Sequence, residues 1–242
     1  MFAILSDIHG NRPALEAVLD EVRKLGIGRI MVLGDVVGYG PFPSDCLRLL
    51  TDAELSLQGN HEAGVLGELD EEWFNDVAWA GIEWTRARLS EQELESISRW
   101  RKSATIEDVQ FAHGSLNPDD PFDYLDSPSS VEDHFAHQTA PLCFVGHTHV
   151  PAIWTEGSEA AVPWPKSGVH TIEPGRKTVI NVGSIGFCRT DDPRPSWVTY
   201  DPIKGEVVLR RTDYDVEATI QAIRRIGHRK FIEKRLLKDL GR

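Results

Sequence analysis

Phe2-Ala-Ile-Leu-Ser-Asp-Ile-His9 opens the chain with an apolar run that ends in an aspartate and a histidine two positions apart. A short continuous apolar run of this kind is typical of a buried strand. The segment 11–24 then repeats apolar residues at helical spacing, and the runs 30–33 and 55–58 predict two further strands around a short helix at 44–50. This alternation of strand and helix predicts parallel pairing with right-handed crossovers.

The second half of the chain is predicted to be rich in strands. Its apolar runs predict strands at 109–112, 142–145, 151–155, 177–181, 197–200 and 206–210, followed by helices at 215–226 and 229–240. The Pro/Ser/Asp-rich stretch 117–130 reads as a surface loop. Residues 65–102 form an aromatic-rich helical segment, which either packs against a sheet or forms a cap-like insertion over a site. We see no clear boundary and expect a single domain over residues 1–242.

Composition narrows the classes of function. The 242-residue chain has 38 acidic and 26 basic residues, for a formal net charge of −12. Nucleic acids and membrane surfaces are polyanions that would repel such a chain, so we expect neither as a general partner. The segment 224–242 is an exception with eight Lys and Arg residues, which form either a solvated helical face or a docking surface for an acidic partner.

The cysteines and the N-terminus indicate a cytoplasmic protein. Cys46, Cys143 and Cys188 lie far apart and are odd in number, so we expect reduced thiols. The first apolar run ends at Asp7 without a basic flank, unlike a signal peptide. No apolar run reaches the ~18 residues of a membrane-spanning helix. The sequence carries no signal for the oligomeric state.

Polar residues collect where the predicted strands end. In chain order these residues are Asp7 with His9, Asp35, Asn60 with His61, His113, and His147 with His149. Ligands of open α/β sheets bind outside the carboxyl ends of the strands, so segments on neighbouring strands would converge on one spot. Imidazole and carboxylate donors together suit manganese, iron, cobalt, nickel or zinc, and disfavour an all-oxygen calcium site.

The order of these motifs resembles the calcineurin-like metallophosphoesterase family. The family pattern is D-x-H, G-D, G-N-H-[ED], an isolated H and G-H-x-H, and the chain has Asp7-Ile-His9, Gly34-Asp35, Gly59-Asn-His-Glu62, His113 and Gly146-His-Thr-His149. The resemblance runs over essentially the whole chain. The segments 35–41 and 181–186 also resemble small bacterial and archaeal members, which often have proline where Cys188 stands.

The resemblance implies a fold and a set of roles. The fold is of the α/β class, a four-layer αββα sandwich of two mixed sheets flanked by helices. Two divalent metal ions are implied, with manganese expected first and iron, zinc, nickel or cobalt as alternatives. The implied ligands are Asp7, His9 and His149 for the first metal and Asn60, His113 and His147 for the second, with Asp35 bridging both. His61 is not a ligand and stands beside the leaving group.

These assignments predict a hydrolase of phosphate esters. Two divalent cations and only two ligand carboxylates leave a positive site in an acidic protein, which attracts an anionic substrate. A hydroxide held by the metals attacks phosphorus, and His61 protonates the departing alkoxide as a general acid. We expect a phosphodiesterase, with a phosphomonoesterase, a protein phosphatase or a dinucleoside polyphosphate hydrolase as alternatives. A non-catalytic metal-binding scaffold, docking through its basic C-terminal helix, is the alternative from another class.

A few other residues carry weaker expectations. Arg12 and Arg189 could contact substrate phosphate, although ordinary surface roles fit them equally well. Glu62 is expected to cap the helix that follows it. The remaining histidines are expected to be structural or surface residues: His134, His137, His170 and His228.

Overall fold

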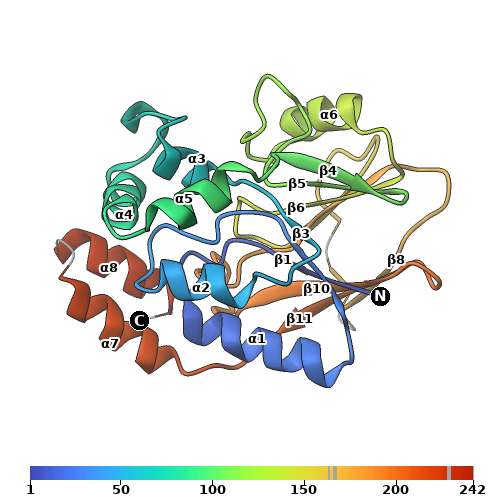
Figure 1. The fold of residues 1–242 in the computed structure, drawn as a ribbon. Coiled ribbons are helices and arrows are strands. Elements are labelled where there is room, and N and C mark those ends of the chain that lie inside the picture. The colour runs from blue at the N-terminus through green and yellow to red at the C-terminus, as the bar shows by residue number, and fades with distance from the viewer. Residues whose placement is uncertain (163, 166–167, 228–229, 242) are drawn as a thin grey trace.

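Two β-sheets lie face to face between helices in this protein (Figure 1). The computed structural model describes residues 1–162, 164–165, 168–227 and 230–241, except for the side chains of residues 231 and 232. Helix α1 (Arg12–Lys24) covers the outer face of one sheet, and α6 (Pro128–His137) covers the outer face of the other. The expected four-layer αββα sandwich of two mixed sheets is therefore confirmed.

The first sheet has six strands in the order β3-β2-β1-β10-β11-β8. Their bounds are β1 (Phe2–Leu5), β2 (Arg29–Val32), β3 (Leu55–Ser56), β8 (Val169–Thr171), β10 (Ser196–Asp201) and β11 (Glu206–Arg211). Strands β1, β2 and β3 pair in parallel through the crossover helices α1 and α2 (Pro43–Leu49), as the sequence predicts. Strand β10 pairs antiparallel with β1 and makes the sheet mixed.

The second sheet has five strands in the order β4-β5-β6-β9-β7. Their bounds are β4 (Ser103–Ile106), β5 (Val109–Ala112), β6 (Leu142–Val145), β7 (Ala152–Thr155) and β9 (Thr178–Asn181). Strands β5, β6 and β9 are parallel to one another, and the two edge strands are antiparallel to their neighbours.

The main core lies between the sheets. Successive side chains of a strand point to opposite faces, and β1 divides its residues in this way. Phe2 and Ile4 pack between the sheets with Phe144 of β6, whereas Ala3 and Leu5 pack against α1. Both faces of the strand are thus covered, which explains why its sequence is apolar throughout rather than alternating.

The remaining helices gather at one end of the sandwich (Figure 1). They are α3 (Asn60–Leu66), the 3₁₀ helix η1 (Glu71–Trp73), α4 (Asp76–Arg86), α5 (Glu91–Ser98), α7 (Val216–Ile226) and α8 (Lys230–Asp239). Ile82 and Ile97 of the aromatic-rich segment are buried in a common apolar cluster, so this segment packs as part of the protein core. Within the described residues, every helix is too short or too polar to traverse a lipid bilayer.

Several sequence predictions need correction in detail. Strands β4 and β8 were not predicted, because both are short edge strands with exposed or half-buried residues and lack an apolar run. The stretch 117–130 is a loop only up to residue 127, since Ser127 caps α6 and Pro128 occupies its first turn. His228 lies outside the described residues.

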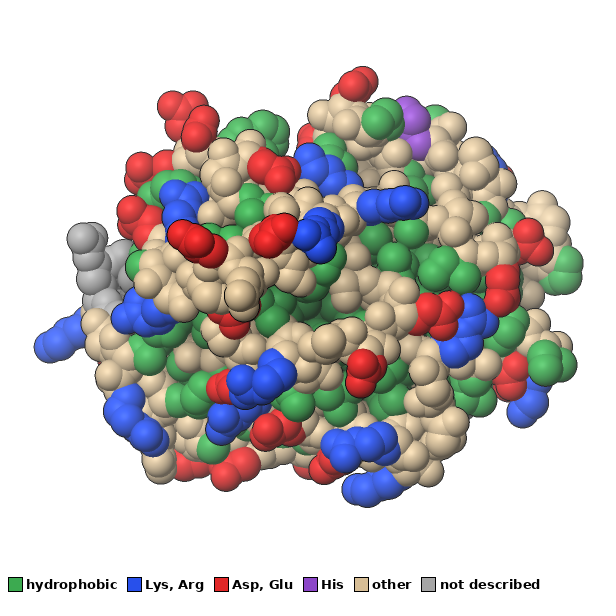
Figure 2. All heavy atoms as spheres, in the orientation of Figure 1, with side chains coloured by type: hydrophobic (Ala, Val, Ile, Leu, Met, Phe, Trp, Pro, Cys, Tyr) green, Lys and Arg blue, Asp and Glu red, His purple; other side chains and the backbone are tan. Residues whose placement is uncertain are grey.

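Positive and negative side chains intermingle on the face of the molecule that Figure 2 shows, without an extended basic surface. Part of the basic C-terminal segment is paired: Arg224 lies 3.6 Å from Glu233, and Arg235 lies 3.2 Å from Asp239. Exposed pairs of this kind contribute little stability. The docking role of this segment stays a prediction.

We predict that His134 makes the protein sensitive to mild acid. Burial lowers the pKa of this α6 histidine to about 4, and its Nδ1 accepts the Leu116 N–H. The unfolded chain, with a pKa of about 6.5, binds the proton more tightly, so stability is lost as the pH falls from about 6.5 towards 4. His134→Asn keeps an acceptor but does not titrate. The unfolding free energy of both proteins should fall between pH 7.5 and 4.5, and the fall should be about 2 kcal/mol smaller for His134→Asn than for the wild type.

The measurement is urea unfolding followed by circular dichroism at the two pH values. The matched control is His137→Asn, which changes an exposed histidine of the same helix. A pH dependence that is the same in His134→Asn and in the wild type would contradict the prediction.

Candidate metal centre

The predicted ligands converge at the edge of the sandwich where strands of both sheets end. Asp7 and His9 follow β1, Asp35 follows β2, Asn60 begins α3 after β3, His113 follows β5, and His147 and His149 follow β6. The segments therefore come from two facing sheets rather than from one row of neighbouring strands, which corrects the sequence expectation on this point. Every one of these side chains except Asn60 is buried.

Asp7, His9 and His149 form the first donor group. His149 Nε2 lies 3.2 Å from Asp7 Oδ1 and 3.1 Å from His9 Nε2. His9 Nε2 lies 3.8 Å from Asp7 Oδ1. Metal–nitrogen and metal–oxygen bonds of about 2.1 Å place donors of one ion roughly 3–4 Å apart, so the spacing suits a single cation.

The second donor group surrounds His113. Its Nε2 lies 3.2 Å from Asn60 Oδ1 and 3.2 Å from His147 Nδ1. Asp35 Oδ2 lies 3.3 Å from the same nitrogen and 3.6 Å from His9 Nε2 of the first group. Asp35 thus stands between the two groups, where a shared carboxylate would have to lie, while its role as a bridge stays a prediction.

The hydrogen bonds of the histidines fix which nitrogen faces the centre. The Nδ1 atoms of His9, His113 and His149 lie 3.1, 2.9 and 2.6 Å from main-chain carbonyl oxygens. A carbonyl only accepts, so each Nδ1 carries a proton, and in the neutral ring Nε2 is the nitrogen with the lone pair. When both rings are neutral, the lone pairs of His9 and His149 point at each other, which is repulsive unless a proton or a metal cation lies between them.

One orphaned atom leads to the same conclusion. Asp7 Oδ1 is buried and has no hydrogen-bond partner among the described residues. A buried ionised oxygen without a donor is costly unless a cation compensates it. The donor set therefore fits divalent metal ions, and the anchoring of the histidines by main-chain carbonyls matches the outer hydrogen bonds that orient metal-binding histidines.

Electrostatics keep most of these groups ready to bind metal. Burial would raise the pKa values of Asp7 and Asp35, but His149 beside Asp7 and His113 beside Asp35 hold both well below the ordinary value. Burial lowers the pKa of His147 to about 3. Burial would also lower the pKa of His113, but the Asp35 charge raises it to about 9, so His113 must release a proton when a metal binds.

The backbone is strained at the ligands. Asp7, His9, Asp35, His147 and His149 all have φ between 49° and 67°, in the left-handed region that non-glycine residues rarely adopt. Such conformations cost of order 1–3 kcal/mol each and persist only where the surroundings impose them. Their concentration at one place, where each strand turns sharply into a loop, indicates that the chain is held in this shape for the site.

Glu62 does more than cap helix α3. Its carboxylate accepts the Gly59 N–H at 2.8 Å, as expected of a cap, and also accepts the N–H groups of Asp35, Val36 and Val37 at 2.8–3.1 Å. It therefore ties the turn that presents Asp35 to the loop that presents Asn60. Burial and the charge of Asp35 raise the pKa of Glu62 to about 7.

The loop 184–189 braces the same centre from the other side. Ser184 Oγ donates to the main-chain oxygen of Asp7 at 2.8 Å, and the Phe187 carbonyl accepts from His149. Cys188 is buried, and its Sγ lies 2.9 Å from the main-chain oxygen of Ser184. Among the described residues, its hydrogen bonds are to Ser184, Arg194 and Arg211, none of them a predicted ligand.

Of the two candidate substrate contacts, the structure brings only Arg189 to the metal pocket. Arg189 lines the pocket together with His61, Asn60 and the two histidines of β6. Arg12 lies elsewhere: its guanidinium is 3.2 Å from Asp45 and stacks over the Phe42 ring. The expected substrate contact through Arg12 is therefore not supported by its position.

Sequence reasoning missed several residues around the pocket. The Tyr39 ring lies 4.6 Å from the rings of both His9 and His61, and Tyr124 stacks on His147 at 3.9 Å. Trp73 and Asn75 line the pocket from the aromatic-rich segment. The aromatic content of that segment is the one sequence feature that could have pointed to Trp73 as a pocket residue. Tyr124 lies in a polar loop, and its sequence surroundings give no such indication.

Comparison with known proteins agrees with this geometry. Residues 1–203 match the calcineurin-like phosphoesterase superfamily domain, and the chain belongs to this family. It is 31% identical to the uncharacterized protein MJ0912 of Methanocaldococcus jannaschii, over all of this chain and 96% of that protein. A crystal structure of a metallophosphoesterase from Sphaerobacter thermophilus is 33% identical, with a TM-score of 0.86 over 98% of this chain and 99% of that one.

A more distant structure shares the fold. The hypothetical protein PH1004 of Pyrococcus horikoshii is 19% identical, with a TM-score of 0.76 over 98% of each chain. The family and the clustered Asp and His donors together indicate a site for divalent metal ions.

We predict that Gly38 is required because it makes room for His61. Gly38 has φ +91°, and a Cβ there would lie 2.1 Å from His61 Nδ1. Gly67 has φ +78° and nothing within 4 Å of such a Cβ, so Gly67→Ala measures backbone strain alone. Gly38→Ala should destabilise the protein by at least about 1 kcal/mol more than Gly67→Ala, because overpacking adds to the strain. Equal losses in urea unfolding would contradict the close approach.

We also predict that divalent metal stabilises the native chain. Addition of Mn²⁺ to chelator-treated protein at 100 times its dissociation constant should raise the unfolding free energy by about 2.7 kcal/mol, because the donor groups are assembled only in the folded state. Asp35→Asn should lose most of this gain. Asp45→Asn, which changes a carboxylate of α2, should keep it. Calorimetry and elemental analysis report the outcome, and full metal content in Asp35→Asn would contradict the bridge.

Proposed function

We propose that the protein hydrolyses phosphodiesters with two divalent metal ions, and that His61 donates the proton to the departing alcohol. The observation that carries the proposal is the arrangement of two donor groups on either side of Asp35, with histidine ring nitrogens directed inwards. When bound, two such ions lower the pKa of an attacking water and stabilise charge on the phosphoryl group. The chain would supply position, charge and the proton.

Arg189 supports an anionic substrate. It is the only Lys or Arg among the described residues lining the metal pocket, and its Nε is buried without a hydrogen-bond partner. None of the described carboxylates forms an ion pair with it. Burial would lower the pKa of Arg189, but neighbouring Tyr39, Tyr124 and Asp239 raise it, so the side chain stays cationic. A phosphoryl oxygen would provide the missing partner.

The single guanidinium in the pocket favours a diester over a monoester. A monoester dianion carries one more negative charge and generally requires a further clamp. Neither a second arginine nor a lysine of the described residues lines the metal pocket. A singly charged diester matches Arg189 and the two ions better.

The position of His61 suits a proton donor, provided that bound substrate raises the pKa of its imidazole. His61 follows Asn60 at the start of α3, and its main-chain N–H donates to Asp35 Oδ1 at 2.9 Å, which fixes the residue beside the centre. Burial lowers the pKa of His61 to about 4, below the ~6.5 of an unperturbed imidazole. A bound anionic phosphate would raise the pKa again, so we propose that His61 is charged only when substrate is present.

Metal identity and location complete the proposal. The mixed nitrogen and oxygen donors suit manganese, our first choice, and also iron, zinc, nickel or cobalt. The three cysteines are free and buried, in keeping with a reducing cytoplasm. A buried histidine beside the centre is of no use to a passive metal-binding scaffold, which supports the enzyme over that alternative.

We predict that His61→Ala retains both metals but loses about 10²–10⁴ in turnover on an alkyl phosphodiester, the usual range for a general acid. The loss should be clearly smaller on a nitrophenyl diester, because nitrophenolate leaves readily without a proton. Turnover is measured with Mn²⁺, with and without chelator, and metal content by elemental analysis. Equal losses on both esters with intact metal content would assign His61 a binding role instead.

A further inference from the structure

We infer that the cavity between α4 and α8 receives the departing alcohol, and that this alcohol is a neutral polyhydroxylated group of sugar or nucleoside size. The inference rests on the proposed phosphodiesterase function. Hydrolysis breaks the bond between phosphorus and the alcohol oxygen, places a hydroxyl group from water on phosphorus, and returns one proton to the alcohol. The alcohol needs a place beside the proton donor, and the structure offers one.

The metal pocket is too small for a complete substrate. It offers about 40 Å³, far less than the ~300–1,000 Å³ usual for small-molecule sites, so it can receive only the reacting end of a substrate. The neighbouring cavity encloses about 500 Å³ and shares Tyr39, Asn75 and Arg189 with the metal pocket. A volume of this size lies in the range of about 300–1,000 Å³ that is usual for small-molecule sites.

This cavity adjoins the metal pocket at Tyr39, Asn75 and Arg189. The Tyr39 ring lies 4.6 Å from the rings of both His61 and His9. Phe74, next to Asn75 in the chain, has its ring 5.9 Å from the His61 ring. A group that leaves phosphorus past His61 and Tyr39 therefore has the cavity between α4 and α8 beside it.

The lining of the cavity decides the chemistry of its occupant. Two guanidinium groups, Arg189 and Arg235, face two carboxylates, Asp76 and Asp239, so the formal charge is balanced. A further phosphate group on the alcohol would find no excess positive charge. Carboxylates accept from hydroxyl groups, and guanidinium and amide groups donate to them, so the lining suits an uncharged group with several hydroxyls.

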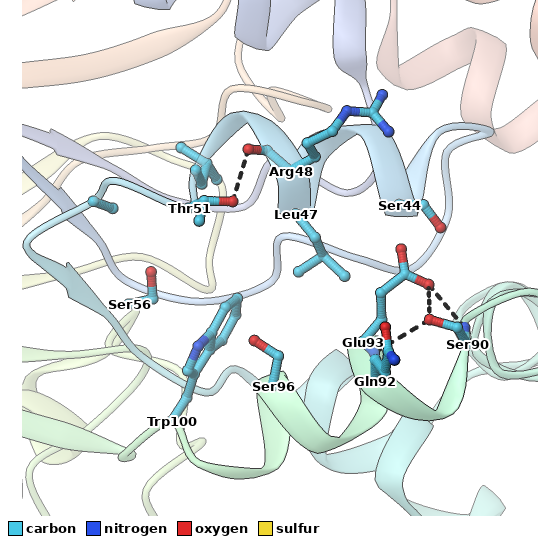
Figure 3. A pocket seen from close by; sticks show the side chains of 12 residues that line it. Ser44, Leu47, Arg48, Thr51, Ser56, Ser90, Gln92, Glu93, Ser96 and Trp100 are labelled. Carbon is cyan, nitrogen blue, oxygen red and sulfur yellow. Dashed lines mark hydrogen bonds between the residues drawn. The ribbon is translucent and has the colours of Figure 1, made fainter.

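A second cavity provides the control. It encloses about 540 Å³ between α2 and α5, and Figure 3 shows Leu47, Ser96 and Trp100 around it. It shares no lining residue with the metal pocket. A large side chain placed there tests the effect of filling a similar surface cavity without approaching the site.

The experiment measures inhibition of Mn²⁺-dependent bis(p-nitrophenyl) phosphate hydrolysis by two uncharged probes, uridine and methyl glucoside. At least one should inhibit the wild type competitively. Val77→Trp introduces a large ring at the cavity wall. It should raise the inhibition constant of that probe, and the factor of this rise should be at least about ten times the factor by which kcat/KM for the diester falls. Asp76→Ala, which removes one acceptor and adds no bulk, should weaken inhibition by the same probe. Ser96→Trp should match the wild type in both measurements.

Each outcome bears on one claim. Absence of inhibition by both probes, or unchanged inhibition in Val77→Trp and Asp76→Ala, would overturn the inference while leaving the phosphodiesterase proposal intact. Absence of diester hydrolysis by the wild type would instead refute the proposed function itself. In that case binding of uridine to the Mn²⁺-loaded protein, measured by calorimetry for the same variants, would still test the cavity.

Discussion

The electrostatic demand of the metal centre is the constraint on which most of this structure depends. The Nε2 atoms of His9 and His149 lie 3.1 Å apart, and Asp7 Oδ1 has no hydrogen-bond partner among the described residues. Such an arrangement is unfavourable in a buried place without cations, so the rest of the chain must hold it in position. Glu62 does so for the turn at Asp35 through four main-chain N–H groups, and the loop 184–189 does so for Asp7 and His149.

The sandwich explains how one chain supplies donors on both sides of a shared carboxylate. Each sheet contributes strand ends to the same edge, and the apolar core between the sheets fixes the distance between them. The sharp turns after β1, β2 and β6 place non-glycine residues at positive φ, which is unfavourable locally. The stability of the two packed sheets compensates this local strain, so the site is rigid because the fold beneath it is rigid.

The substrate side of the site is built differently from the metal side. The predicted metal ligands follow strands of the core, whereas Trp73, Asn75 and Tyr124 come from connecting segments and a helix end. Connecting segments can change without disturbing the core, so they are the natural place for determinants of specificity. In this chain the C-terminal helix α8 adds Arg235 and Asp239 beside Arg189. The proposed chemistry thus belongs to the sheets, and the proposed selectivity belongs to the helices around them.

The sequence by itself determined the order of strands and helices in the first third of the chain, and it predicted the donor residues that the structure brings together. Both follow from local signals: apolar runs such as Phe2–Leu5, and polar motifs placed directly after them. Only the tertiary structure decided that these motifs meet across two sheets, that Arg189 rather than Arg12 faces the pocket, and that burial shifts the pKa of His61 to about 4. Position relative to distant segments and burial from water depend on the packing of the whole chain, which the local pattern of residues does not encode.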